Sequence, residues 1–472
     1  MAMRALFALG ATAVGALAVW LMVGTGFANY DTVYSLLWGA DVAHGRSPDY
    51  DVPVAPTPHP LATFAGVVLS PLGADAEGAA VLLALVFLGA LGWVTYALGS
   101  QWFGPAAGVL AAVIILTRQP VLSFGIRAYV DVPYLVLVLA ALLVEARRPR
   151  AGLPVLGLLV LAGLLRPEAW LFSAVYVVWM LVDASFRADR RGVLAVVVAA
   201  ALAPVIWSLA DLAVTGDLLY SLTGTRENAE VLDRKTGLSN VPLTVPRRLG
   251  EILREPVLVG AALGGGLALA LIPRRAALPA AAGVLSILAF CVLAAAGLPI
   301  LGRYLLLPAT LLAIFCGAGA FGWLALARDD PWRRRWLGAG VVVGLALIAF
   351  TPRQIERIDS LRSAIAVQRA IVSDLHGLAD SGAIREACGP VAVPNHRPVP
   401  LLALRLDRPA AEIVSAQLTR PRAGSYVAPA SARVERNFTL DRNDPRRLTA
   451  SVPPEFKRVT GNASWILFAR CR

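Results

Sequence analysis

Long apolar runs, nearly free of charge, recur along most of this chain and constrain its fold more than any other feature. Each run is roughly 17 to 25 residues long, the length that lets an α-helix cross the hydrocarbon core of a bilayer. We count about eleven such runs by this criterion. They lie near residues 5–25, 78–98, 103–117, 130–146, 151–165, 168–186, 192–214, 256–273, 277–297, 303–327 and 336–350. The sequence therefore predicts an α-helical multi-pass membrane protein.

Arginine is distributed unevenly among the loops between these runs. Four loops on one predicted side carry two to four Arg residues each: 145–150, 187–191, 273–275 and 328–335. Residues 26–77 fall on the other side and have a net charge of −5, from Arg46 against six acids. Cytoplasmic loops collect Arg and Lys, so we expect the N-terminus in the cytoplasm and the C-terminus outside it. The net charge of +12 follows from the same bias and does not indicate nucleic-acid binding.

The apolar runs end near residue 350, and the remainder of the chain is polar. We therefore expect a transmembrane domain over 1–350 and an extracytoplasmic soluble α/β domain over 351–472. Helical spacing over 355–378 is followed by three segments typical of strands: 389–395, 399–406 and 464–471. Cys388 and Cys471 lie in this region, and a disulfide between them requires an oxidising compartment, in agreement with an external domain.

The first external loop, 26–77, begins with a helical pattern. One face of that helix carries Asp31, Tyr34, Trp38 and Asp41, and another carries Val33, Leu36 and Ala40. The pattern predicts an amphipathic helix that lies on the bilayer surface. The acids Asp41, Asp49 and Asp51 are equally explained as a solvated surface. Asp31 differs because it directly follows the first span, although acids are also favoured in the first turn of any helix.

Ionisable side chains gather at the outer ends of the predicted spans, whereas the middles of the spans hold almost none. They come from separate segments: Arg127 and Asp131, Arg166 and Glu168, Asp211 and Asp217, and Arg303 beside Tyr304. A proton or ion pathway needs such groups at mid-depth. The distribution favours a site at the outer interface. The simpler interpretation of each Arg is that its side chain reaches toward lipid headgroups.

Short motifs in these regions resemble the GT-C glycosyltransferases, which include protein O-mannosyltransferases, the lipid A aminoarabinose transferase and mycobacterial arabinofuranosyl- and mannosyltransferases. The matching residues of the first loop are Tyr30-Asp31, Gly45, Pro48-Asp49-Tyr50 and His59-Pro60-Leu61. Two later matches are "LLRPEAW" and "GRYLLLP", and the resemblance covers about residues 1–350. It implies inverting transfer of a sugar from a polyprenyl-phosphate-sugar donor to a cell-envelope acceptor, whether glycan, lipid or protein, outside the cytoplasm.

The resemblance also implies roles for individual residues. Asp31 matches the first-loop acid of the family, which accepts the proton of the acceptor hydroxyl. The leaving polyprenyl phosphate requires a cation that suits phosphate. Arg303 is the first candidate for that cation, with Arg166 and Arg127 after it. Two further substrate contacts are His59 and Tyr304, although a His between prolines is equally a turn residue.

A second acid accompanies the first in many members of the family, and Asp131 and Asp49 compete for that place here. Asp131 could position the acceptor or a bound cation, but a structural role is the favoured interpretation. The family contains metal-dependent and metal-independent enzymes, so a divalent cation stays open as a cofactor, and the sequence has no Cys/His spacing of a dedicated metal site. The polar loop 215–250 either covers the site when the donor binds or is an ordinary connection.

Two other functions compete with sugar transfer. A transporter or lipid flippase would need mid-membrane charges and paired broken helices, and the sequence has neither an internal repeat nor such charges. A non-catalytic envelope assembly protein would tolerate the loss of Asp31. Neither the sugar nor the acceptor is specified by these residues.

Overall fold

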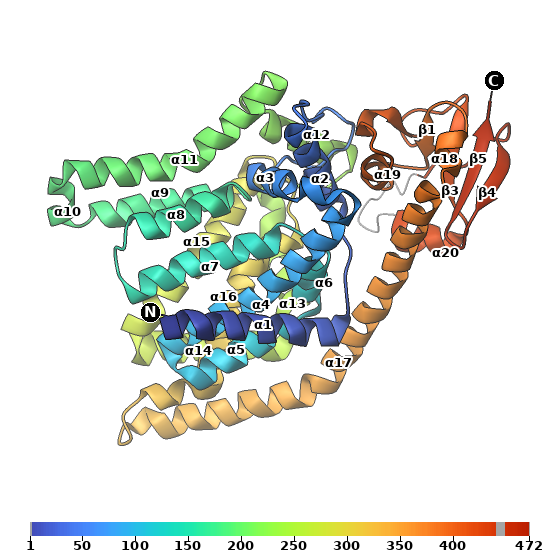
Figure 1. Ribbon diagram of the computed structural model, residues 1–472. Helices are drawn as coiled ribbons and strands as arrows, with labels where there is room; N and C mark the ends of the chain where they lie inside the picture. The colour runs from blue at the N-terminus through green and yellow to red at the C-terminus, as the bar shows by residue number, and fades with distance from the viewer. Residues whose placement is uncertain (1, 440–448, 472) are drawn as a thin grey trace. The chain divides into compact units, whose positions relative to one another are not determined.

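The structure is a computed structural model that describes residues 2–439 and 449–471 (Figure 1). It consists of two compact units, each assembled from separate stretches of the chain. Unit one comprises Met1–Thr25, Leu82–Ser208 and Thr236–Leu361. Unit two comprises Gly26–Val81, Leu209–Lys235 and Arg362–Arg472. The expected boundary between residues 350 and 351 remains a sequence-based expectation.

Unit one is built from apolar helices. They are α1 (Ala2–Val23), α4 (Ala76–Phe103), α5 (Pro105–Thr117), α6 (Gln119–Ile126), α7 (Asp131–Arg147), α8 (Leu153–Gly163), α9 (Glu168–Leu181), α10 (Ala184–Ala188), α11 (Arg190–Thr215), α13 (Val241–Leu253), α14 (Glu255–Leu271), α15 (Pro273–Ala295), α16 (Leu306–Phe321) and α17 (Pro331–Asp380), with short 3-10 turns η2 (Leu238–Asn240), η3 (Gly302–Leu305) and η4 (Gly322–Ala325). Of these, α4, α11 and α17 continue into unit two.

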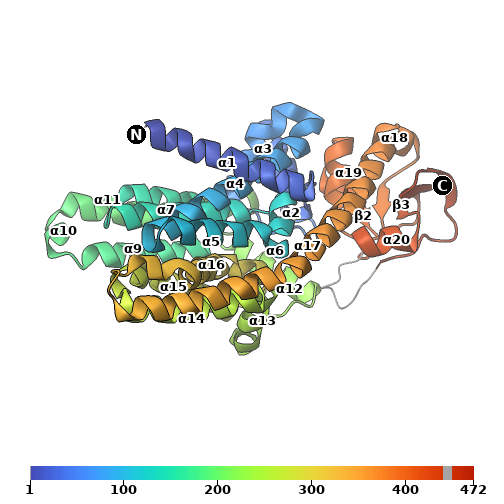
Figure 2. The same cartoon turned by 90° about the horizontal axis from the view of Figure 1, so that it is seen from below.

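Helix α16 forms the centre of unit one and is buried along nearly its whole length. It packs against α5 and α14 (Figure 2). Small residues allow this close approach, because a side chain at Gly317 would collide with the backbone of α5 at Ala107. A side chain at Gly319 would likewise collide with the backbone of α14 at Gly260. The "CGAGAF" end of α16 therefore sets the spacing of the bundle.

The chain is an integral membrane protein with many spans. Among the described residues, six helices are long and apolar enough to cross a bilayer, and two bent pairs raise the number to eight if each pair is one span. The bends are 64° between α5 and α6 and 107° between the η2–α13 segment and α14. The predicted count of eleven is not confirmed. The runs expected near 130–146, 151–165 and 168–186 form α7, α8 and α9, which have 17, 11 and 14 residues.

Unit two combines the loop after α1 and the segment 209–235 with the C-terminal part of the chain. Its helices and 3-10 turns are α2 (Tyr30–Ala43), α3 (Pro60–Leu69), η1 (Ser70–Asp75), α12 (Tyr220–Val231), α18 (Ala383–Glu386), α19 (Val399–Leu406), η5 (Ala410–Glu412) and α20 (Ala432–Val434), followed by a π-helical turn η6 (Glu435–Thr439). We call residues 383–471 the C-terminal lobe.

The C-terminal lobe carries a five-stranded sheet in the order β2-β1-β3-β5-β4. Its strands are β1 (Val391–Val393), β2 (Ile413–Ser415), β3 (Gly424–Pro429), β4 (Lys457–Gly461) and β5 (Trp465–Arg470). Strand β1 pairs in parallel with β2 and β3, whereas β5 pairs antiparallel with β3 and β4. A disulfide joins Cys388, just before β1, to Cys471, just after β5. The lobe therefore has the α/β composition expected from the sequence.

One of the three predicted strands is a helix instead. The segment 399–406 forms α19, which packs on strand β2 and on helix α2. Pro400 occupies the first turn, where its missing N–H would have no helical partner in any case. An eight-residue apolar segment fits either a buried strand or a short helix by periodicity alone. Tertiary packing decides between them here.

Helix α2 is present over Tyr30–Ala43, close to the predicted position, but its surroundings differ from the prediction. Val33 and Leu36, expected to face the bilayer, are 0% and 4% exposed within unit two. Tyr34 and Trp38 are buried as well, in a core shared with strands of the C-terminal lobe. Helix α2 is therefore a core element of unit two, and both of its faces contact protein.

Candidate active site

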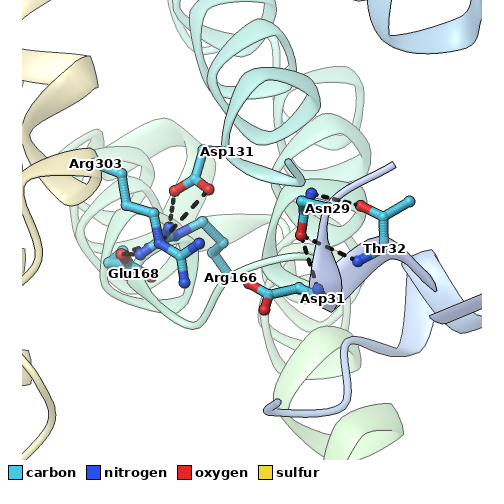
Figure 3. Close-up of polar contacts among 7 residues, drawn as sticks. All are labelled: Asn29, Asp31, Thr32, Asp131, Arg166, Glu168 and Arg303. Atoms are coloured by element: carbon cyan, nitrogen blue, oxygen red, sulfur yellow. Dashed lines mark hydrogen bonds and ion pairs between the residues drawn. The ribbon is translucent and has the colours of Figure 1, made fainter. Parts of the chain in front are cut away.

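Four charged side chains from separate elements meet in unit one (Figure 3). Arg166, between α8 and α9, forms an ion pair with the Oδ1 atom of Asp131. It also donates from Nε at 3.0 Å and from Nη2 at 2.5 Å to Oε1 of Glu168. The Nε atom of Arg303 lies 3.8 Å from the other carboxylate oxygen of Asp131. We call these four residues the charged quartet.

Local structure explains how these residues reach one another. Asp131 and Glu168 each begin a helix, α7 and α9, where the helix dipole favours negative charge. Arg166 precedes Pro167, which ends the preceding turn and caps α9. Arg303 lies in the 3-10 turn that leads into α16. The four residues of the quartet therefore lie at or near the N-termini of helices or in a turn, and not in the apolar middles of the helices.

Burial distinguishes the members of the quartet. Arg166, Asp131 and Glu168 are 5%, 2% and 8% exposed, whereas the Arg303 side chain is 18% exposed. Buried charges are tolerated when they are paired and hydrogen-bonded, and two cations here face two anions. Two carboxylates engage the guanidinium of Arg166, whereas Arg303 is the more exposed of the two arginines.

Aromatic rings complete the surroundings of the two arginines. The guanidinium of Arg166 lies 3.8 Å from the ring centre of Tyr304, and that of Arg303 lies 5.1 Å from the ring centre of Tyr129. A cation over an aromatic face is stabilised by the ring quadrupole. The cavity beside Tyr304 and Glu168 has about 10 Å³, the space of one water molecule rather than of a substrate. Tyr304 therefore contacts the guanidinium of Arg166.

Asp31 lies in unit two, where its backbone position is fixed by a helix cap (Figure 3). The Asn29 side chain accepts hydrogen bonds from the backbone N–H of Asp31 at 2.8 Å and of Thr32 at 3.3 Å. Its amide also donates to the Thr32 hydroxyl at 2.8 Å. The backbone of Asp31 is thus held in the first turn of α2, and the residue is partly accessible to solvent. An accessible carboxylate at a fixed backbone position is suited to proton transfer.

Residues of the C-terminal lobe lie beside the start of α2, and sequence reasoning did not find them. The ring of His396 contacts the ring of Tyr30 edge-on, at 5.4 Å between centroids. Burial raises the pKa of Tyr30 well above its usual range, although the charge of Arg397 opposes the shift. The Tyr30 hydroxyl therefore stays neutral and donates to the Val54 carbonyl at 2.9 Å. The only sequence signal was a polar segment, Asn395–Arg397, directly after an apolar strand.

The other predicted site residues are distributed between the units. Arg127 caps the end of α6 and donates to the Ser123 hydroxyl at 2.9 Å. His59 occupies the N-cap position of α3, directly before Pro60. Asp49 accepts a hydrogen bond from the backbone of Asp51 at 3.2 Å, as expected of a turn residue.

Metal binding requires several oxygen, nitrogen or sulfur donors around one point. In the part of the chain that the structure describes, no three His, Cys, Asp or Glu side chains converge in this way. Asp131 is paired with arginines, and their positive charge opposes a cation at the same place. The donor set of the charged quartet therefore does not fit a divalent cation.

No family profile matches the chain, and no curated protein matches its sequence. Several solved structures resemble its fold, among them three that differ in their activities. The arabinofuranosyltransferase AftD from Mycobacteria has a TM-score of 0.59 and 16% identity, over 98% of this chain and 40% of that one. ArnT from Cupriavidus metallidurans, bound to undecaprenyl phosphate, has a TM-score of 0.56 and 14% identity, over 97% of both chains.

The third is the archaeal oligosaccharyltransferase AglB from Archaeoglobus fulgidus, in complex with an inhibitory peptide and a dolichol-phosphate. Its TM-score is 0.51 and its identity 10%, over 92% of this chain and 70% of that one. At such low identities the likeness concerns the fold, and this chain spans less than half of AftD. All three are membrane glycosyltransferases of the class that the motifs resemble. The chain therefore has the fold of the GT-C membrane glycosyltransferases.

Proposed function

We propose that this protein is an inverting glycosyltransferase that moves a sugar from a polyprenyl-phosphate carrier to a cell-envelope hydroxyl at the outer face of the membrane. The observation that carries the proposal is a GT-C fold over 97% of the chain, with an acid held by a helix cap directly after the first span. ArnT was solved with undecaprenyl phosphate and AglB with dolichol-phosphate, which supports a lipid phosphate donor.

The reaction needs a base, and Asp31 is our candidate. The acceptor oxygen attacks the anomeric carbon and forms the new glycosidic bond. The bond between that carbon and the phosphate oxygen breaks, and its electron pair leaves with the polyprenyl phosphate. The hydroxyl proton passes to the Asp31 carboxylate, so atoms and charges balance. Attack opposite the leaving group inverts the anomeric configuration.

The leaving phosphate gains negative charge as the bond breaks, and a preorganised cation stabilises that charge. Arg303 is our candidate, because its side chain is more exposed than that of Arg166, and its ion pair with Asp131, at 3.8 Å, is longer than the contacts of Arg166 with Glu168. Arg127 is the second candidate. The quartet's carboxylates then act as supports that fix the arginines, so Asp131 acts as a positioning acid rather than as a second base.

The orientation in the membrane is part of the proposal. The Arg-rich loops favour a cytoplasmic N-terminus. The disulfide between Cys388 and Cys471 supports an oxidising, extracytoplasmic location for the C-terminal lobe. Asp31 follows the first span and would face the same compartment.

The test uses purified full-length protein in nanodiscs with a panel of polyprenyl-phosphate sugars and envelope acceptors. We expect sugar transfer by the wild type and a loss of about 10²- to 10⁴-fold in Asp31→Asn, the range for removal of a general base. The control is Asp51→Asn, which neutralises an exposed acid of the same loop. Full transfer by Asp31→Asn would refute the assignment of the base. Lipid translocation without transfer by the wild type would favour a flippase.

A further inference from the structure

A cavity of about 90 Å³ lies within unit two, at the C-terminal end of helix α2. Its lining includes two carboxylates, a guanidinium, a hydroxyl and apolar walls: Asp41, Asp49, Arg46, Ser47, Trp38 and Pro409. One water molecule needs about 10 to 15 Å³ by the same measure. The cavity is several times larger, so it has room for a group the size of a ring.

The polar side of the cavity is preformed. Gly45, with φ of 71°, turns the chain back at the end of α2 and brings Arg46 over the last turn of the helix. The Nε atom of Arg46 donates to Oδ1 of Asp41 at 2.9 Å, and its backbone N–H donates to the Asp41 carbonyl at 2.8 Å. The side chains of Asp41 and Arg46 are 17% and 54% exposed. The pair is therefore ordered but still accessible to a ligand.

The opposite walls come from a separate part of the chain. The indole N–H of Trp38 donates to the Asp49 carbonyl at 3.0 Å, which fixes the loop that carries Asp49. Pro409 and Ala410, from the C-terminal lobe, provide an apolar surface. The cavity thus forms only when the first external loop and the C-terminal lobe fold together in unit two.

The chemistry of the lining indicates the kind of ligand. Two carboxylates against one guanidinium give a net negative lining, which disfavours phosphates and other anions. Carboxylate oxygens accept hydrogen bonds from the hydroxyl groups of a ligand, and the guanidinium donates hydrogen bonds to the oxygens of those hydroxyl groups. The indole, leucine and proline surfaces suit the apolar face of a ring. A sugar residue combines these features, because it carries many hydroxyls around an apolar C–H face.

The position of the cavity separates it from the proposed reaction centre. Asp31 and Asp41 lie on the same helix, ten residues apart in sequence. At 1.5 Å per residue their backbones are about 15 Å apart along the helix axis. A group bound beside Asp41 is therefore too far from Asp31 to react there. A ligand that occupied this cavity and also reached Asp31 would have to be longer than one sugar residue.

We propose that this cavity binds a non-reacting sugar residue of a glycan acceptor, while the acceptor's reacting hydroxyl lies at Asp31. The inference rests on the proposed function, because Asp31 defines the reacting end. It selects a glycan of more than one residue from the acceptor classes that the fold allows. It also gives a place to four of the six acids in residues 26–77: Asp31 as the proposed base, Asp41 and Asp49 in the subsite, and Asp51 on the surface.

A remote subsite that binds substrate and transition state equally affects KM and leaves kcat unchanged. We therefore expect Asp41→Asn to raise KM for a hexasaccharide acceptor by about tenfold or more, since a hydrogen bond to a charged group is lost. The kcat value and the KM for a monosaccharide glycoside remain those of the wild type. Ser47→Leu is the second variant, because it fills the exposed mouth of the cavity without altering its charges. Asp51→Asn is the matched control.

The direct test is equilibrium binding by calorimetry, with full-length protein in nanodiscs and without donor. The probes are arabinofuranose and mannose hexasaccharides and the corresponding methyl monosaccharides. We expect the wild type and Asp51→Asn to bind one hexasaccharide, and Asp41→Asn and Ser47→Leu to bind it at least tenfold more weakly, at unchanged melting temperature. Equal binding by all four proteins, or no hexasaccharide binding by the wild type, would overturn the subsite. Hexasaccharide binding without any sugar transfer would refute the proposed function and leave the subsite standing.

Discussion

Replacing Arg166 by Met tests the charged quartet most severely, because one side chain serves two buried carboxylates. The substitution keeps a long unbranched side chain but removes the hydrogen bonds to Glu168 and the ion pair with Asp131. Asp131 would retain only the 3.8 Å pair with Arg303. Glu168 is 8% exposed, and it would lose both of the hydrogen bonds that Arg166 donates to it.

The expected loss follows from these contacts. Removing one partner of a buried ion pair typically costs about 3 to 5 kcal/mol, because the other charge stays buried without compensation. Removing both partners is often close to neutral. The double variant Arg166→Met with Glu168→Met leaves Asp131 beside Arg303, a neutral pair. We therefore expect it to regain at least about 2 kcal/mol relative to Arg166→Met alone.

The assay is reversible unfolding by SDS titration in mixed micelles, followed by tryptophan fluorescence, for the wild type, both single variants and the double variant. An exposed arginine, Arg458→Met, serves as the control and should change the free energy of unfolding by less than about 0.5 kcal/mol. A loss below about 1 kcal/mol for Arg166→Met would contradict the buried pairing. So would a double variant as unstable as the single one.

Three further predictions concern unit two. Asn29→Ala removes the cap of α2 and should lower the free energy of unfolding by about 0.5 to 2 kcal/mol, measured by the same titration, while Asn29→Ser should retain most of it. Cys388→Ser removes the disulfide to Cys471 and should lower the free energy of unfolding of the lobe by about 2 to 5 kcal/mol. Dithiothreitol should destabilise the wild type by a similar amount and should leave the stability of the variant unchanged. Burial raises the pKa of Tyr50 to about 12, so the folded state resists ionisation of this hydroxyl. The free energy of unfolding should therefore fall as the pH rises above about 10, where the unfolded chain ionises. Between pH 9 and 11 the melting temperature of Tyr50→Phe should decrease less than that of the wild type.

The sequence was sufficient to predict much of unit one and the start of α2. The apolar runs identified a membrane protein, and motifs such as Tyr30-Asp31 identified the fold class. Helix α2 was predictable because its spacing begins directly after Asn29, a residue that favours the cap. The proximity of Asp131 and Arg303 was also foreseeable, since both fall at the outer ends of spans.

What the sequence did not reveal depends on tertiary contacts. Val33 and Leu36 look like residues that face lipid, and only the folded C-terminal lobe and α3 explain their burial in protein. The sequence places Arg166, Glu168 and Asp131 at the same ends of the spans, but it does not indicate that Arg166 forms ion pairs with both acids. The cavity beside Asp41 needs Pro409, more than three hundred residues further along the chain. Local patterns cannot specify such meetings.

The most direct test of the central claim is the single-turnover rate of sugar transfer in wild type and Asp31→Asn, with donor bound in advance so that binding does not limit the rate. We expect a decrease of at least about 100-fold in Asp31→Asn. We also expect an unchanged rate in Asp51→Asn and a product of inverted anomeric configuration. An equal rate in Asp31→Asn, or a product with retained configuration, would contradict the proposed mechanism.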